Sequence, residues 1–174
     1  FPVGESNTVW VGPKIENYYM HGTTPSIYKP VTKQFTLGGN GDAYGASTDS
    51  GFGWAYKADN GFAVSSNVVS KQNGTSNGLF TDQSKQSWAT QAGYTTDQWS
   101  VSAIVNNKYN GWTDGYYESQ QHTSSNFTAD VTNFTAIGLR AWWRPQETGT
   151  ATPAVSFGYD TTDFDGAPEA SNNS

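Results

Sequence analysis

SWATQAGYTTDQWSVSAIVN, residues 87–106, shows the architecture more clearly than any other part of the chain. Side chains of one kind recur at every second position on both sides of a polar turn. A period of two is the spacing of a β-strand, because successive side chains point to opposite faces. One predicted face carries Trp88, Thr90, Ala92, Tyr94, Trp99, Val101, Ala103 and Val105, and the other face is mostly small and polar.

The turn between these two strands predicts their register. A two-residue loop at 96–97 would place Tyr94 opposite Trp99 and Ala92 opposite Val101. That register matches apolar with apolar side chains, and only Ile104 falls on the polar side. Each strand then has about nine residues, close to the roughly 9–11 that cross a bilayer as a tilted strand.

The same alternation recurs from about residue 43 to residue 164, where six strand-like segments follow one another. Their connections are short at 57–61, 96–97 and 145–152, and long and polar at 71–86 and 107–132. Tight turns at one rim and long loops at the other are typical of outer-membrane barrels. We therefore expect an all-β fold, an antiparallel up-and-down transmembrane β-barrel, present here as a partial barrel of about 6–8 strands.

The amino-acid composition is compatible with part of a transmembrane β-barrel. The 174 residues are only 34% hydrophobic and 14% charged, but 15% aromatic, and disordered chains are poor in aromatic residues. A net charge of −6 without a basic stripe argues against nucleic acid as a partner. The chain has no cysteine, which excludes disulfides and thiolate metal sites. No apolar run approaches the roughly 18 residues of a helical membrane span.

Aromatic residues gather beside the predicted short turns, where the girdle of a membrane barrel lies. They are Tyr56, Phe62, Tyr94, Trp99 and Trp143. Cross-strand aromatic pairing near the hairpin ends of a soluble sheet is the alternative interpretation.

Two arginines indicate which face of the predicted sheet contacts water. An Arg on the lipid side costs roughly 2–4 kcal/mol at mid-depth, so the face of Arg140 and Arg144 is expected to line an aqueous lumen. Leu139 and Ala141 then point to lipid. The predicted lumen-lining residues are Gln91, Ser100, Ser102, Arg140, Trp142 and Arg144.

The first forty residues differ from the rest. A short strand at 8–11 is expected to stop at Pro13, which has no N–H for a ladder. The long stretch that follows has no clean period, and we expect it to fold into the lumen as a constriction loop. Its candidate constriction residues are Glu16, Lys29 and Lys33.

At this point the sequence resembles a known family. The runs TVWVGPKIENYYM at 8–20, TPSIYKP at 24–30, LGGN at 37–40, YGAST at 44–48 and GFG at 51–53 resemble cyanobacterial outer-membrane porins. These porins belong to the carbohydrate-selective porin superfamily, and their full-length forms carry a surface-layer-homology domain. The resemblance covers most of the chain and is strongest before residue 70.

The resemblance implies one porin barrel domain over residues 1–174, as part of a larger barrel. Residues 1–42 hold the first strand and the inward-folded constriction loop, 43–164 the six-strand meander, and 165–174 the start of an external loop. The chain starts without Met and ends in loop-like sequence, so we expect an interior piece of a longer protein.

The function implied is passive diffusion of small hydrophilic solutes and ions, sugars or inorganic ions, through a water-filled pore in the bacterial outer membrane. The implied partners are outer-membrane lipid, those solutes, and further copies in a homo-trimer of the full-length form. A secreted carbohydrate-binding β-sandwich and a jelly-roll glycoside hydrolase are the alternatives, since strands at 8–12-residue spacing suit both.

No catalytic, cofactor or metal site is expected. The two histidines, His21 and His122, lie in loop-like stretches with no group to orient them as bases or ligands. The acids at 160–165 miss the spacing of a calcium loop and are expected to begin a solvated loop. Paired glycosidase carboxylates stay open at the level of sequence.

Overall fold

The computed structural model describes residues 1–24, 43, 48–72, 78–110, 133–147 and 151–165. These residues form eight strands and one short 3-10 helix, η1. In chain order the elements are β1 (Pro2–Val3), β2 (Asn7–Glu16), η1 (Asn17–Met20), β3 (Thr48–Lys57), β4 (Phe62–Lys71), β5 (Lys85–Thr95), β6 (Trp99–Tyr109), β7 (Asn133–Trp143) and β8 (Val155–Asp165).

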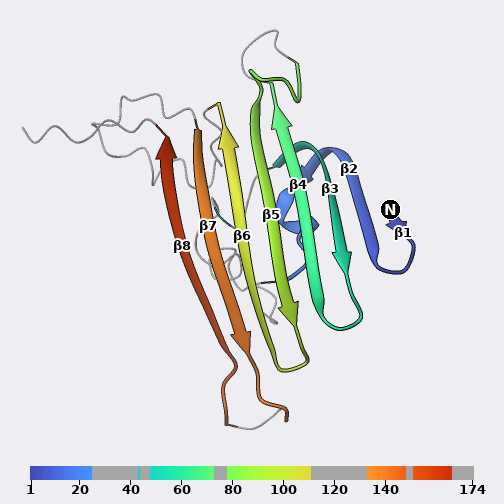
Figure 1. Cartoon of the computed structure of the whole chain (residues 1–174), viewed down its shortest axis with the longest axis vertical. Helices are drawn as coiled ribbons and strands as arrows, with labels where there is room; N and C mark the ends of the chain where they lie inside the picture. Colours follow the sequence, from blue (N-terminus) through green and yellow to red (C-terminus); the bar gives the residue numbers. More distant parts are fainter. Residues whose placement is uncertain (25–42, 44–47, 73–77, 111–132, 148–150, 166–174) are drawn as a thin grey trace, which may run out of the picture.

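All eight strands belong to one sheet, in which each strand pairs antiparallel with the next along the chain. Figure 1 shows them side by side in sequence order, from blue β1 to red β8. The expectation of an all-β, up-and-down architecture is therefore confirmed. The sheet is open, because β1 and β8 each have a strand partner on one side only among the described residues.

The connections alternate in length as expected. Within β3 to β8, the short ones are 58–61, 96–98 and 144–154, and the long ones are 72–84 and 110–132. Figure 1 places the short turns together at the lower rim of the sheet. The first short turn needs Gly61, whose φ of +97° lies in the left-handed region that favours glycine.

The meander itself begins later than predicted. Its first strand, β3, starts at Thr48 rather than near residue 43. Ala43 instead lies buried in a small cluster on one side of the sheet.

The pleat separates two faces of different chemistry. The apolar face is the side of the sheet that carries Phe62 of β4 and Tyr159 of β8, together with the residues of the strands between them that point the same way. It carries most of the large exposed hydrophobic residues. The polar face, defined by the alternate residues, is where the buried side chains of the sheet lie. This distribution is the reverse of a soluble sheet, in which the apolar side is the covered one.

The buried core lies against the polar face. One cluster joins Met20 of η1 to Val69 of β4, with Trp10 and Ile15 packed beside them. A second cluster contains Ile104 with Ala43, Ala89 and Ala136, and Tyr18 packs against it. Ile104 is an exception to the predicted alternation because its side chain belongs to this cluster, against which Tyr18 of η1 packs.

The first strand is longer than expected. We predicted that it would end at Pro13, but β2 continues to Glu16 and pairs with β3 both before and after the proline. A register shift between Gly12 and Ile15 accommodates the proline, since a bulge leaves a residue without a ladder partner. A proline therefore marks a bulge here and not a strand end.

The predicted register of the β5–β6 hairpin is wrong by two residues. Tyr94 pairs with Val101 instead of Trp99, and Ala92 pairs with Ala103 instead of Val101. The turn lies one residue further along, at Asp97 and Gln98, because the Thr96 amide donates to the Trp99 carbonyl at 2.7 Å. The Thr96 hydroxyl oxygen also accepts bonds from the amides of Gln98 at 3.3 Å and Trp99 at 3.1 Å. A shift of two preserves both faces, whereas a shift of one would have inverted them.

We expect Thr96→Ala to lower the free energy of unfolding by about 1 kcal/mol, because these amides lose their acceptor. Urea unfolding of the folded protein measures the effect. Thr96→Ser keeps the hydroxyl and should unfold like the parent. Equal loss in both variants would show that the hydroxyl does not set the turn.

Candidate functional site

The apolar face carries two rows of aromatic side chains, one near each rim of the sheet. The row near the short turns contains Phe62, Tyr94, Trp99 and Trp143. The row near the long loops contains Phe52, Phe80, Trp88 and Tyr109. Tyr94 and Trp88 are six positions apart on one strand, so the rows are separated by roughly 20 Å.

Between the rows, the hydroxyl groups of the apolar face bond to one another. Ser66 and Thr90 are cross-strand partners whose hydroxyl oxygens are 3.1 Å apart. The indole of Trp88 donates to Ser66 at 2.8 Å. These polar groups on the apolar face thus find partners within the sheet.

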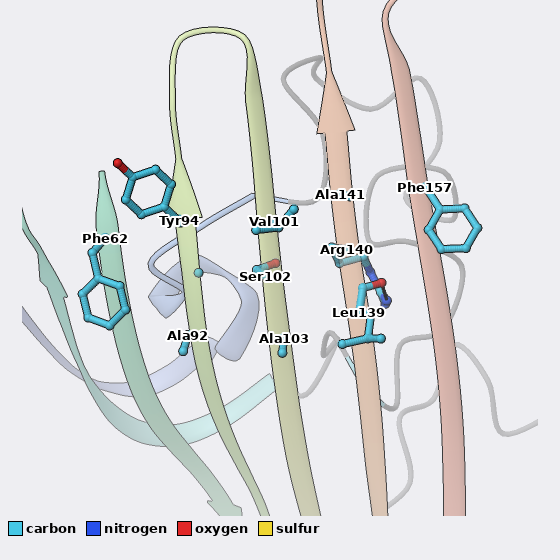
Figure 2. A pocket seen from close by; sticks show the side chains of 11 residues that line it. Phe62, Ala92, Tyr94, Val101, Ser102, Ala103, Leu139, Arg140, Ala141 and Phe157 are labelled. Atoms are coloured by element: carbon cyan, nitrogen blue, oxygen red, sulfur yellow. Dashed lines mark hydrogen bonds between the residues drawn. The ribbon is translucent and has the colours of Figure 1, made fainter. Parts of the chain in front are cut away.

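A hollow of about 530 Å³ lies in the centre of the apolar face. Figure 2 shows Phe62, Tyr94, Leu139 and Phe157 around it, with the short side chains of Ala92 and Ala103 between them. Its lining surface is almost entirely apolar, although Ser102 and Arg140 also border it, so the hollow suits an apolar group better than a polar solute.

The six predicted lumen residues lie together on the polar face of β5, β6 and β7 and the residue after it. They are Gln91, Ser100, Ser102, Arg140, Trp142 and Arg144. Gln91, Ser100, Arg140 and Trp142 are buried, while Ser102 and Arg144 are half-buried. The structure thus brings the whole predicted set to one surface, although most of that surface is covered.

Part of the cover is residues 17–24, here named the inner segment, which consists of η1 and the four residues after it. Figure 1 shows η1 against the sheet, where it packs on β3 and β4. The Gln91 side chain accepts from the Thr23 amide at 3.0 Å and donates to the Thr23 carbonyl at 3.4 Å. The Gly22 amide donates to Ser65 at 3.0 Å.

Asn67 holds the other end of the inner segment. Its side-chain amide donates to the Asn17 carbonyl at 3.4 Å and lies 3.4 Å from His21 Nδ1. Glycine makes this close approach possible, because a Cβ on Gly53 would lie 2.6 Å from the Met20 sulfur. The polar face is therefore built to receive this segment.

Glu16 lies where the inner segment begins, at the end of β2. Burial, together with a hydrogen bond to Glu16, raises the pKa of the Tyr18 phenol well above its usual value. The phenol therefore stays neutral at physiological pH. The other two predicted constriction residues, Lys29 and Lys33, lie outside the described residues.

Arg140 forms a buried ion pair with Asp160 on the polar face. Its Nη1 lies 2.5 Å from Asp160 Oδ1 of β8, and the side chains are 2% and 10% exposed. Asp160 is therefore part of a strand, and the expectation of a loop beginning at 160 is wrong. Arg144 differs, because its Nε donates to the Asp97 carbonyl oxygen beside the short turn.

The predicted set of lumen-lining residues did not include Asp160, Asn67 or Lys108, which also lie on the polar face. Asp160 had a usable signal, since an acid and an arginine share one face of two strands predicted to be neighbours. Lys108 is fully buried, with its amine 5.6 Å from the centre of the Phe134 ring. Nothing in the local pattern distinguished Lys108 from a surface lysine.

Neither a metal centre nor a helical span is found. The described residues contain no group of three or more His, Cys, Asp or Glu that could hold a metal ion. In the same part of the chain, no helix has the length and apolar character to cross a membrane.

Comparisons with protein-family models, with curated proteins and with solved structures give no match to the chain. Its function is therefore inferred from the chemistry of its two faces.

Proposed function

We propose that this chain forms part of the wall of a bacterial outer-membrane porin, which lets small hydrophilic solutes and ions diffuse through a water-filled pore. One observation carries the proposal: the sheet exposes its apolar face and covers its polar face, which holds a buried arginine and glutamine. A membrane barrel needs this arrangement, because hydrocarbon lies outside and water inside.

The apolar face has the dimensions of a membrane-facing band. Its aromatic rows, roughly 20 Å apart, correspond to the two girdles that flank an apolar band about 25 Å tall. Beyond the band the same face becomes polar, since Thr135 donates to Asn107 at 2.9 Å on the long-loop side of Ile137. The strands of 10 or 11 residues also suit a tilted crossing.

The polar face then faces the lumen, and the inner segment lies within the lumen against β4 and β5. Hydrogen bonds with the side chains of Ser65, Asn67 and Gln91 hold it in place, with Ser65 and Gln91 accepting and Asn67 donating. The segment narrows the passage, as expected of a constriction loop. The function requires no chemical step by the protein, because solutes cross by diffusion between polar walls.

The open edges of β1 and β8 require further pairing in the membrane, since unsatisfied backbone groups are costly in hydrocarbon. Further strands that close the barrel meet this requirement. The full-length protein, assembled as a trimer in the outer membrane, is the form in which we expect transport.

Planar bilayers containing the purified full-length protein test this function. We expect stepwise conductance that requires insertion from detergent, and swelling of vesicles in permeant sugars. A protein that stays soluble without detergent and gives no conductance would instead support the carbohydrate-binding sandwich or the hydrolase.

A further inference from the structure

The ion pair of Arg140 and Asp160 is held from several sides. Arg140 Nη1 also donates to the carbonyl oxygens of Leu139 at 2.9 Å and Tyr159 at 3.3 Å. Charge-assisted bonds with fixed acceptors on both strands leave the guanidinium little freedom to reorient. The pair is therefore a fixed part of the polar face, unlike a flexible surface salt bridge.

Gly138 provides the space for this pair. It is the direct cross-strand partner of Asp160, and a Cβ there would lie 2.7 Å from Asp160 Oδ1 and 3.0 Å from Arg140 Nη1. Any larger residue at 138 would push the two charged groups apart. Three positions on two strands are thus fitted to one ion pair.

We propose that Asp160 determines the ion selectivity of the pore by cancelling the charge of Arg140. The proposal rests on the porin function above and identifies which charges on the lumen side act on passing ions. At 2.5 Å the opposite charges form a compact dipole, whose field falls faster with distance than that of a lone cation. Arg140 therefore attracts anions only weakly while Asp160 is ionised.

Arg144 has a different role. Its bonding partner is the neutral Asp97 carbonyl, and among the described residues no carboxylate forms an ion pair with it. A partly exposed cation in a narrow, low-dielectric passage keeps its attraction for anions. Of the two arginines predicted to line the lumen, Arg144 is therefore the one that attracts anions.

Reversal potentials in a salt gradient test the proposal on the full-length pore in planar bilayers. Asp160→Asn removes the carboxylate charge beside Arg140 and should raise the chloride-to-potassium permeability ratio by roughly two- to tenfold. Arg140→Gln removes the guanidinium charge beside Asp160 and should lower the ratio by a similar factor. The double variant Arg140→Gln with Asp160→Asn should return the ratio close to that of the parent.

A swapped pair, Arg140→Asp with Asp160→Arg, covers the case in which one single variant fails to assemble. It keeps both charges and should retain the parent ratio. Single variants with the parent selectivity, or a double variant that differs from the parent as strongly as either single, would overturn the proposal. A parent protein with no conductance would instead overturn the porin function itself, and the selectivity proposal with it.

Discussion

Leu139→Arg is expected to reduce the folded, membrane-inserted fraction by roughly 30-fold or more. Leu139 lies in the middle of the apolar face, 48% exposed, between Ala103 of β6 and Tyr159 of β8. An arginine at the bilayer midplane on the lipid side of a barrel costs about 2–4 kcal/mol, and about 1.4 kcal/mol is a factor of ten. Urea titration of the protein folded into lipid vesicles measures the loss.

Thr135→Arg is the matched control, on the same strand and face, four positions toward the long loops. Thr135 has the polar Asn107 and Asp163 as cross-strand neighbours. An arginine near the interface costs only about 0–1 kcal/mol, apart from the lost bond to Asn107. Equal effects at 135 and 139, or greater solubility of Leu139→Arg without detergent, would contradict a lipid-facing apolar side.

Gln91→Ala is expected to detach the inner segment from the sheet. Gln91 is 1% exposed and bonds both the amide and the carbonyl of Thr23. Losing these bonds costs about 1–2 kcal/mol, which raises the detached population about 5- to 30-fold. Amide hydrogen exchange at Gly22 and Thr23 should accelerate by that factor, and single-channel conductance should rise.

Gln86→Ala is the control for this second prediction. Gln86 is a glutamine of the same strand, but its side-chain amide bonds Thr81 and Ser84 near the long-loop rim. Its loss should leave exchange at Gly22 and Thr23 unchanged. If Gln91→Ala and Gln86→Ala accelerate exchange equally, Gln91 has no specific role in holding the inner segment.

The strand pattern could be predicted because it depends on local alternation. The faces of β5, β6 and β7 follow from a period of two that residues 87–106 and 133–143 display with few exceptions, such as Ile104. The register could not be predicted, since it depends on a turn at Asp97 and Gln98 that Thr96 fixes by accepting bonds from two amides. A turn at 96–97 and a turn at 97–98 give the same faces, so alternation cannot separate them.

The candidate site could likewise be predicted only in part. Six polar-face residues could be assigned from alternation and from the cost of arginine in lipid. The partners that fix them are non-local: Asp160 is 20 positions from Arg140, and Thr23 is 68 positions from Gln91. Such contacts depend on strand register and on the path of the inner segment, which has no periodic signal. The bulge at Pro13 escaped prediction because a proline also ends strands.

Spin labels on three consecutive residues of β6 test most directly which face meets lipid. The chain has no cysteine, so Val101→Cys, Ser102→Cys and Ala103→Cys each introduce one labelling site. In vesicles, labels at 101 and 103 should collide readily with oxygen, which concentrates in hydrocarbon, and rarely with a water-soluble nickel complex. The label at 102 should show the reverse preference or be shielded from both. Labels at 101 and 103 that meet the nickel complex freely, or that are hidden from both reagents inside a water-soluble protein, would contradict the membrane wall.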